Sequence, residues 1–304
     1  MDTIACIEEH ADVLIEDIHD LTDADWLSKR KLGVGGSDAA AAIGLSPYVS
    51  RFALWHIKTT SGYSVVDNEA MEAGRRLEGV IGEWYGEREG IDVRRYPKML
   101  RSKDHPHMLV NLDFIGPERV IEVKNVGFRM AEEWEHGKVP DHYMLQGQHS
   151  LAVTGLPAVD FAVLIGGQEL RSVTVERNDS LIDALTDAEA SFWHMVENGT
   201  PPSADGSDAT TRAIKDRWPE PIEGESVELP MDIIHLIHER KLAKKGLKEA
   251  EWRVDAVENS IKAMLGDAEF GRLDGRVVVS WKLITRKGYT VDEAQYRRLE
   301  VPKR

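Results

Sequence analysis

Short segments in which apolar and polar residues alternate occupy the middle of the chain, and this period of two is typical of β-strands. They predict strands near residues 92–100, 107–114, 119–125, 158–165 and 169–176. Longer segments carry apolar residues every three or four positions, which is typical of amphipathic helices. They predict helices at residues 4–20, 37–43, 50–60, 68–88, 129–136, 141–154 and 179–197. A β-rich middle flanked by helices indicates an α/β or α+β fold built on a mixed sheet.

Two of these predicted helices contain residues that favour a defined start or end. Ser37 is a natural N-cap for the helix at 37–43, and Gly44 follows that helix as a stop signal. The helix at 68–88 is predicted to end at Gly90, because glycine tolerates the left-handed conformation that closes many helices.

The chain is predicted to divide into three parts. Residues 1–198 hold the strands and helices above and form one core domain. Residues 199–230 contain five of the twelve prolines, which indicates a linker or an extended arm. In residues 231–304 an apolar seam, broken only by Arg240, predicts a coiled-coil-like helix of about 33 residues. A β-hairpin that includes residues 276–284 is predicted next, followed by a basic segment at 286–289.

Three charged residues interrupt the apolar strands near the centre of the chain. Asp113 ends one apolar run, and nine residues later Glu122 begins an alternation with Val123 that continues to Lys124. The side chains of Glu122 and Lys124 therefore project from the same face of a strand, about 7 Å apart along it. A Gly-Pro turn at 116–117 predicts a hairpin that brings Asp113 beside Glu122.

Two carboxylates and one ammonium group on a sheet face cost free energy unless a further charge compensates them. A divalent metal ion together with a phosphate would provide that compensation. The alternative is a surface ion pair between Glu122 and Lys124 across one strand. Asp113 and the apolar residues on either side favour a functional site.

Two predicted helices place further polar side chains where they can join such a site. Glu78 falls near the buried stripe of its helix, where a carboxylate needs a partner such as a metal ion. The alternative is an exposed Glu78 that forms an ion pair with Arg75, three residues earlier on the helix. Tyr143 and Gln146 are three residues apart and share a helix face, from which they can orient a water molecule or a phosphate. The alternative is that the polar groups of this helix lie in solvent and have no role in a site. His149, on the same helix, is expected to be a structural histidine.

A glycine-rich turn precedes the predicted helix at 37–43. Gly35 and Gly36 lead into Ser37, and a turn of this kind at a helix start presents backbone N–H groups that suit a phosphate. Arg30 can add a two-pronged contact to the same anion. The alternative is an ordinary capped helix that follows a loop and binds no phosphate. The turn is not a Walker A motif, because the Gly-Lys-Ser/Thr ending is missing.

Composition restricts the classes of site and partner. The net charge of −15 argues against a nucleic-acid partner, yet residues 1–30 hold a net charge of −7 while residues 231–304 hold +4. A metal-dependent nuclease also needs carboxylates, and bound cations reverse the local field. The single cysteine, Cys6, excludes an internal disulfide and cysteine-built zinc or iron–sulfur sites within one chain.

Hydropathy predicts a protein that does not associate with membranes. No run approaches 18 apolar residues, and the N-terminus lacks a basic segment followed by an apolar one. We therefore expect a soluble, cytoplasmic protein with no membrane partner.

Taken in order, these motifs resemble those of the YqaJ-like viral recombinase family, phage-type exonucleases to which lambda exonuclease is related. The resemblance covers roughly residues 25–200 and begins with a signature formed by Trp26, Arg30, residues 35–40, residues 45–48 and residues 54–58. Glu78, Asp113, Glu122-Val123-Lys124 and Gln146-x-Gln148 follow in the family's order and spacing. One position departs from the pattern, since Phe114 follows Asp113 where the family often has glycine.

The resemblance implies a restriction-endonuclease-like core that digests one strand of linear double-stranded DNA from 5′ to 3′ with the help of a metal ion. It implies that Asp113, Glu122, Glu78 and the Val123 backbone carbonyl bind Mg²⁺ or Mn²⁺. Lys124 would then orient or activate the attacking water.

The same resemblance assigns the remaining site residues. Gln146 and Gln148 would support the catalytic group. The residues that would bind the substrate, including the 5′-phosphate of a DNA end, are Arg30, Gly35, Gly36, Ser37 and Tyr143.

The resemblance also implies partners and a biological setting. It implies a ring-shaped homo-oligomer, a single-strand annealing recombinase that coats the 3′ tail, and a phage or prophage gene expressed in a bacterial host. Residues 231–304 lie outside the resemblance. Two alternatives stay open: a structure- or site-selective DNA endonuclease with the same core, and a non-catalytic module that binds DNA or a protein partner.

Overall fold

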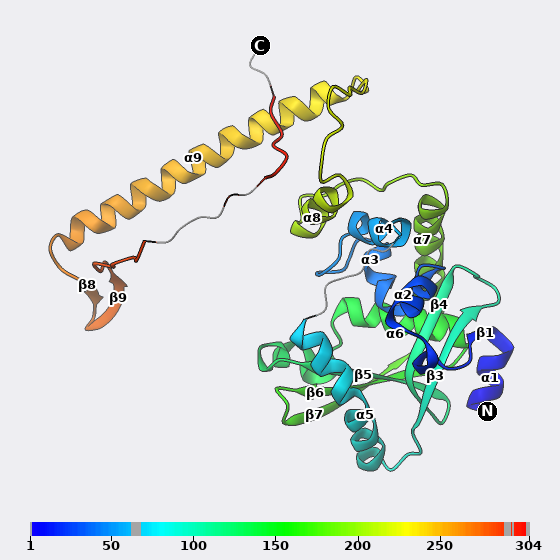
Figure 1. Cartoon of the computed structure of the whole chain (residues 1–304). Helices are drawn as coiled ribbons and strands as arrows, with labels where there is room; N and C mark the ends of the chain where they lie inside the picture. Colours follow the sequence, from blue (N-terminus) through cyan, green and yellow to red (C-terminus); the bar gives the residue numbers. More distant parts are fainter. Residues whose placement is uncertain (1, 62–67, 289–292, 294, 302–304) are drawn as a thin grey trace. The chain divides into compact units, whose positions relative to one another are not determined.

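The fold is built around one sheet, seen in a computed structural model that describes residues 2–61, 68–288, 293 and 295–301. Its strands are β1 (Ala11–Ile15), β2 (Val34–Gly35), β3 (Arg94–Ser102), β4 (Met108–Gly116), β5 (Arg119–Val126), β6 (Ala158–Ile165) and β7 (Glu169–Glu176). The spatial order is β1-β3-β4-β5-β6-β7 (Figure 1). β2 pairs with β4 off this path. Only β5–β6 and β2–β4 are parallel, so the sheet is mixed and mostly antiparallel. The five strands predicted in the middle of the chain are confirmed.

Helices flank both faces of this sheet, with α5 (Glu69–Glu89) packed on one face and α6 (Asp141–Thr154) on the other. The other helices of this part of the chain are α1 (Thr3–His10), α2 (Asp23–Arg30), α3 (Ala39–Ala42), α4 (Arg51–Thr59), α7 (Asp179–Glu197) and α8 (Asp208–Arg217). Short 3₁₀ segments are η1 (Ile18–Asp20), η2 (Gly36–Asp38) and η3 (Phe128–Gly137). The predicted class, a mixed sheet core flanked by helices, is confirmed.

The alternation of side chains along β6 shows how the two faces are filled. Phe161 and Val163 pack in the core on the α6 side, whereas Ala162 and Leu164 pack with Ile81 of α5 on the other side. All eight residues of β6 are buried, as expected for a strand covered on both faces. Because β5 lies next to β6, any group on β5 that faces α6 is placed between the sheet and that helix.

The predicted helix at 4–20 is wrong beyond His10. The chain leaves α1 at Ala11, whose backbone is extended, and continues as β1. β1 pairs with β3 and completes the edge of the sheet, so pairing of the backbone outweighs the apolar spacing that suggested a helix. The helix predicted at 129–136 is instead 3₁₀ and is interrupted at Glu135 and His136.

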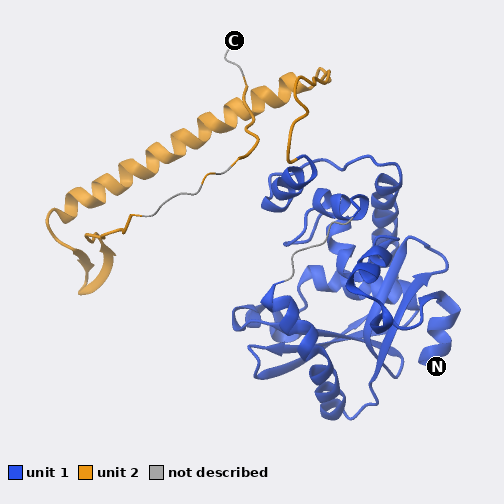
Figure 2. Ribbon diagram, viewed as in Figure 1, with its two compact units in different colours: residues 1–218 blue, residues 219–304 orange. Residues whose placement is uncertain are grey.

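The remainder of the chain forms a second compact unit, residues 219–304, after a first unit of residues 1–218 (Figure 2). The second unit contains α9 (Ile233–Leu265), β8 (Phe270–Leu273) and β9 (Arg276–Ser280). The 33-residue helix is therefore confirmed. The hairpin is present, but it is formed by residues 270–273 and 276–280, so its first strand lies before residue 276 and the prediction is wrong for residues 281–284. Residue 289, at the end of the predicted basic segment, lies outside the described residues.

The segment predicted as a linker, 199–230, contains a helix. α8 packs on α4 in the first unit, where Ala213 is buried and the Thr210 hydroxyl donates a 2.7 Å hydrogen bond to the Ser50 hydroxyl. The prolines lie on either side of α8, which is why their abundance suggested an unstructured arm. Among the described residues, no helix is long and apolar enough to cross a bilayer.

Candidate active site

Asp113 stands at an irregularity in β4. Arg95 of β3 pairs with Phe114 and the next residue, Tyr96, pairs with Leu112, so Asp113 is the extra residue of a β-bulge. The Asp113 Oδ2 atom accepts a 2.8 Å hydrogen bond from the Val123 backbone N–H of β5. The N–H and C=O of one strand residue point the same way, so the Val123 carbonyl also faces the side on which Asp113 lies.

Glu122 and Lys124 project from β5 toward α6, as their spacing predicted. The Lys124 Nζ lies 2.7 Å from Glu122 Oε1 and 3.1 Å from Gln146 Oε1. Gln146 in turn donates from Nε2 to the same Glu122 oxygen at 2.5 Å. Only 4% of Glu122 is exposed, so these partners satisfy a carboxylate that has lost its water. The Tyr143 ring centre lies 4.8 Å from Lys124 Nζ, which confirms that Tyr143 and Gln146 share a helix face.

The charges of this acid cluster, which we define as Asp113, Glu122, Glu78 and Lys124, act on one another. Burial, followed by the negative charges of Glu122 and Glu78, raises the pKa of Asp113 well above its usual range. Burial alone would lower the pKa of Lys124, but the carboxylates of Glu122 and Asp113 raise it. Asp113 and Glu122 therefore share the Lys124 ammonium group, while Glu78 is paired with Arg95, so three carboxylates face two cationic groups at the cluster.

Glu78 reaches the cluster from α5. Burial raises its pKa, the nearby Arg95 opposes that rise, and Glu122 adds to it. The Arg95 Nη1 of β3 lies 3.9 Å from Glu78 Oε1, so its ion-pair partner is on the sheet. Within the described parts of the chain, no three acidic, histidine or cysteine side chains converge closely enough to hold a metal ion. The negative charge of Glu122 thus raises the pKa of the other two carboxyl groups, while the Glu122 side chain is hydrogen-bonded to Lys124 and Gln146.

Arg30 and Ser37, which were predicted to bind a phosphate, contact each other directly. The Arg30 Nη2 donates to Ser37 Oγ at 2.7 Å, and the Arg30 guanidinium lies over the Trp26 ring at 4.8 Å. The prediction that Ser37 caps a helix is wrong. Residues 36–38 form η2, and α3 begins only at Ala39. The Ser37 hydroxyl accepts the hydrogen bond from Arg30 and does not cap a helix.

A buried ion pair lies beneath Arg30. The Lys58 Nζ of α4 is 2.6 Å from Asp38 Oδ2 and donates to the Arg30 backbone carbonyl at 2.7 Å, and its side chain is 3% exposed. Asp38 also accepts from Arg30 Nη2 at 3.3 Å and from the Gly35 N–H at 3.0 Å. Burial would raise the pKa of Asp38, but Lys58 and Arg30 lower it to about 2. The Gly35 N–H predicted to face a phosphate is thus already occupied.

Gly36 connects this Arg30 cluster, defined as Arg30, Ser37, Asp38 and Lys58, to the acid cluster. A Cβ atom added to Gly36 would lie 3.5 Å from Gln146 Cγ and 3.5 Å from Ser150 Oγ, both on α6. Gln146 also hydrogen-bonds Glu122. η2, which begins at Gly36, therefore rests on the same part of α6 that supports the acid cluster.

Gln148 does not join the site, contrary to prediction. Its Nε2 donates to the Glu176 carbonyl at 2.8 Å and its Oε1 accepts from the Asn178 N–H at 2.9 Å, so it fastens α6 to the end of β7. Two residues along a helix turn a side chain by about 200°, which is why Gln148 faces away when Gln146 faces the cluster. His149 is structural as predicted, with Nδ1 2.9 Å from Glu189 and Nε2 2.8 Å from the Leu109 carbonyl.

A glycine on α5 sets how closely this helix approaches Asp113. A Cβ atom at Gly82 would lie 2.3 Å from the ring of Phe114, the residue that follows Asp113. We expect Gly82→Ala to destabilise the protein by about 1–3 kcal/mol and to lower activity, because α5 must move away and take Glu78 with it. Thermal unfolding and nuclease assays measure both effects.

Gly74, on the same helix, provides the matched control for that prediction. Nothing lies within 4 Å of the Cβ position of Gly74, so Gly74→Ala should leave packing intact. It should stabilise α5 by up to about 1 kcal/mol, because alanine favours the helix more than glycine does. Equal effects of the two substitutions would show that contact with Phe114 does not set the position of α5.

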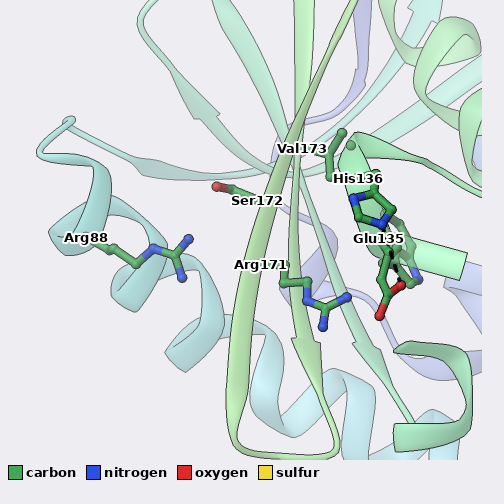
Figure 3. Close-up of a pocket in the computed structure, with 8 residues that line it drawn as sticks. Arg88, Glu135, His136, Arg171, Ser172 and Val173 are labelled. Carbon is green, nitrogen blue, oxygen red and sulfur yellow. Dashed lines mark ion pairs between the residues drawn. The ribbon is translucent and has the colours of Figure 1, made fainter. Parts of the chain in front are cut away.

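A separate hollow lies outside β7 and contains two arginines (Figure 3). Arg171 is committed to Glu169, with an Nε–Oε1 distance of 2.7 Å, and to the Ala131 carbonyl at 2.8 Å. Arg88 donates to the Leu170 carbonyl. Because both guanidinium groups have protein partners and the acid cluster is elsewhere, this hollow is not part of the candidate site.

Lys58 was the principal residue that interpretation of the sequence missed. It lies four residues after Leu54 and three after Trp55, both buried, so it falls on the apolar stripe of α4. A lysine at such a position must have an anionic partner. This signal indicates a buried acid nearby but does not indicate which acid.

Comparisons with known proteins find a family model and a relative that match this chain. The family model described as the YqaJ-like viral recombinase domain matches residues 25–157. The chain is 33% identical over 280 residues to the uncharacterized protein YqaJ of Bacillus subtilis (strain 168), an alignment that covers 90% of this chain and 87% of the relative.

Solved structures share the fold at lower identity. The alkaline exonuclease LHK-Exo of Laribacter hongkongensis matches 58% of this chain and 93% of its own, with 21% identity and a TM-score of 0.49. Its complex with dAMP matches 64% of this chain and 96% of its own, with 19% identity and a TM-score of 0.50. The first unit of this chain thus has a fold that is also found in a nuclease.

Proposed function

The chain belongs to the YqaJ-like viral recombinase family, and from that premise we propose that it is a metal-dependent exodeoxyribonuclease. Its substrate would be linear double-stranded DNA with a 5′-phosphate, of which it digests one strand from 5′ to 3′. The observation that carries the proposal is the acid cluster. Asp113 at a β-bulge and Glu122 on the adjacent strand share Lys124 as their cation.

We propose that Asp113, Glu122, Glu78 and the Val123 carbonyl hold Mg²⁺ or Mn²⁺, which requires the Glu122 carboxylate to leave Lys124 and Gln146, because the three carboxylates do not converge in the structure as described. All four are hard oxygen donors, which these ions prefer, and the excess of negative charge around Asp113 supports a cation there. When bound, the metal ion supplies Lewis-acid activation of water and neutralises charge at the phosphate.

The chain's own residues would orient the reacting groups. The Lys124 ammonium is held between Glu122 and Gln146, so it presents a fixed positive charge beside the position of the scissile phosphate and orients the attacking water. The Asp113 carboxylate is fixed by the Val123 N–H. Tyr143 restricts Lys124 from one side through its ring.

A nuclease assay on a linear duplex tests this proposal. We expect mononucleotides to be released from a 5′-phosphorylated linear duplex in the presence of Mg²⁺, and no release when a chelator is present. A closed circular duplex should remain intact, because the enzyme needs an end. Cleavage of the circle would instead support the endonuclease alternative, and the absence of any cleavage with Mg²⁺ or Mn²⁺ would support a non-catalytic module.

The Arg30 cluster leads to a prediction about end recognition. Arg30→Gln should lower kcat/KM for a 5′-phosphorylated duplex by about 10–100-fold, because a charge-assisted hydrogen bond to phosphate is lost. Turnover of a 5′-hydroxyl duplex should change little. The exposed Arg76, which pairs with Glu72 on α5, provides the control Arg76→Gln. Wild-type enzyme that digests both ends equally would contradict the assignment of Arg30.

Two further predictions from the resemblance belong with this proposal. A ring-shaped homo-oligomer would keep the enzyme on its DNA, and a single-strand annealing recombinase would coat the 3′ tail that digestion leaves. Both stay predictions, and sedimentation of the free protein and co-purification with such a recombinase test them.

A further inference from the structure

The long helix α9 exposes an apolar face along its whole length. It is the helix labelled α9 in Figure 1, and none of its 33 residues is buried. The predicted seam consists of Ile233, Leu236, Arg240, Ala243, Leu247, Ala250, Val254, Val257, Ile261 and Met264, spaced alternately by three and four residues. Leu247, Val254 and Val257 are 60%, 57% and 61% exposed. An apolar seam of this length on a charged helix is the pattern of a coiled coil whose partner helix is another chain.

The charges on α9 are divided between its two halves. Residues 239–248 carry five basic side chains and one acidic one, a net charge of +4. Residues 249–262 carry four acidic side chains and two basic ones, a net charge of −2. A helix with this division is complementary to an inverted copy of itself, because each basic half then lies along an acidic half.

We propose that α9 pairs with α9 of a second copy of this chain in an antiparallel, two-fold symmetric coiled coil. Such a dimer covers the seam of both helices at once with identical surfaces. The hollow along the seam, lined in part by Ala250, Val254 and Val257, would receive side chains of the partner helix.

Arg240 decides the orientation of the pair. It occupies a seam position, so a parallel dimer would place two Arg240 guanidinium groups opposite each other at the same level. In the antiparallel dimer each Arg240 lies toward the acidic half of the partner. Lys244 and Glu251 lie on the same flank of the seam, and inversion places Lys244 of one copy near Glu251 of the other.

The described residues of the chain's own C-terminal segment do not cover the seam. Leu283 and Ile284, which follow β9, are 102% and 84% exposed, and Tyr296 is 77% exposed. These described residues would be shielded if they packed along α9. A different protein would need a helix with an acidic half and a basic half in the opposite order. An inverted second copy of α9 already has this order.

The oligomeric state of the full-length chain tests the proposal. We expect the mass measured by light scattering to be twice that of Leu247→Glu and Val254→Glu variants, whatever the first unit assembles into by itself. A glutamate buried in the seam should weaken association by roughly 100-fold or more. Trp252→Glu is the matched control: it adds the same charge at a residue 70% exposed on the opposite side of α9, and it should leave the mass unchanged.

A charge exchange distinguishes the orientation and does not depend on a buried glutamate. Lys244→Glu should weaken the dimer, and Lys244→Glu combined with Glu251→Lys should restore it if the helices are antiparallel. In a parallel dimer Glu251 would face Gly246, so the second change would restore nothing. The proposal is overturned if the wild-type mass is not twice that of the seam variants, or if the double exchange fails to restore the dimer.

Discussion

Asp113→Asn should reduce the rate of DNA digestion by about 10³-fold or more while leaving DNA binding and the fold intact. Asparagine keeps the shape of the side chain and can still accept the hydrogen bond from the Val123 N–H, so no cavity is formed. It removes the charge that the proposed metal ion requires. Steady-state digestion of a linear duplex, together with a gel-shift measurement of DNA affinity, separates the loss of rate from a loss of binding.

The same substitution should raise the stability of the protein. Burial and the charges of Glu122 and Glu78 disfavour an ionised Asp113, so neutralising it relieves repulsion in the metal-free protein. Tm should rise by a few degrees, since 1 kcal/mol corresponds to about 2–4 °C for a domain of about 200 residues. Asp92→Asn, a change at a carboxylate that is 78% exposed, should alter neither activity nor Tm. Full activity of Asp113→Asn would refute the proposed site.

Lys58→Met should destabilise the first unit by about 3–5 kcal/mol, the usual cost of leaving one partner of a buried ion pair alone. Methionine has nearly the same length as lysine but cannot compensate Asp38 or donate to the Arg30 carbonyl. The free energy of unfolding in urea measures this loss. Lys98→Met is the control, because Lys98 pairs with Glu16 at the surface, and its loss should cost less than about 1 kcal/mol.

A double variant separates the ion pair from the packing of Lys58. Lys58→Met with Asp38→Asn leaves no unpaired charge, so it should recover a large part of the stability. Burial lowers the pKa of Lys58, so keeping this ammonium charged in the folded protein costs free energy. That cost offsets part of the stabilisation that the lowered pKa of Asp38 represents. If the double variant is as unstable as Lys58→Met alone, the lysine acts through packing and not through charge.

The pH dependence of unfolding provides an independent measure of the same pair. The pKa of Asp38 is lowered from 3.8 to about 2 on folding, so its contribution of roughly 2 kcal/mol is complete above pH 4. It is lost as the pH falls from about 4 to about 2, because the unfolded chain binds a proton first. The Asp38→Asn variant should lack this part of the acid dependence.

The elements that the sequence predicted best are those in which local pattern and final environment agree. β6 is apolar along nearly its whole length and is buried on both faces, and α5 ends at Gly90, whose φ of 67° suits glycine. The segment at 11–15 was misinterpreted because its apolar spacing fits either a helix or an edge strand. Pairing with β3, a contact distant in sequence, decided between them.

The site was predictable to the extent that its residues follow a local period. Glu122 and Lys124 share a strand face because of the period of two, and Tyr143 and Gln146 share a helix face because they are three residues apart. The bulge at Asp113 depends on the register between β3 and β4, which no local pattern specifies. For the same reason the partner of Lys58 could be found only in the structure.

The contact between Gly36 and α6 has a consequence for the length of DNA removed in each cycle. On the proposed function, α6 supports both η2, which contains Ser37, and Gln146 beside Glu122, so the distance from the bound DNA end to the scissile phosphate would be constant. A constant distance would make every product the same size, one nucleotide, regardless of base sequence. A larger side chain at position 36 would push η2 away from α6, and we expect products longer than one nucleotide to appear before the rate of hydrolysis falls.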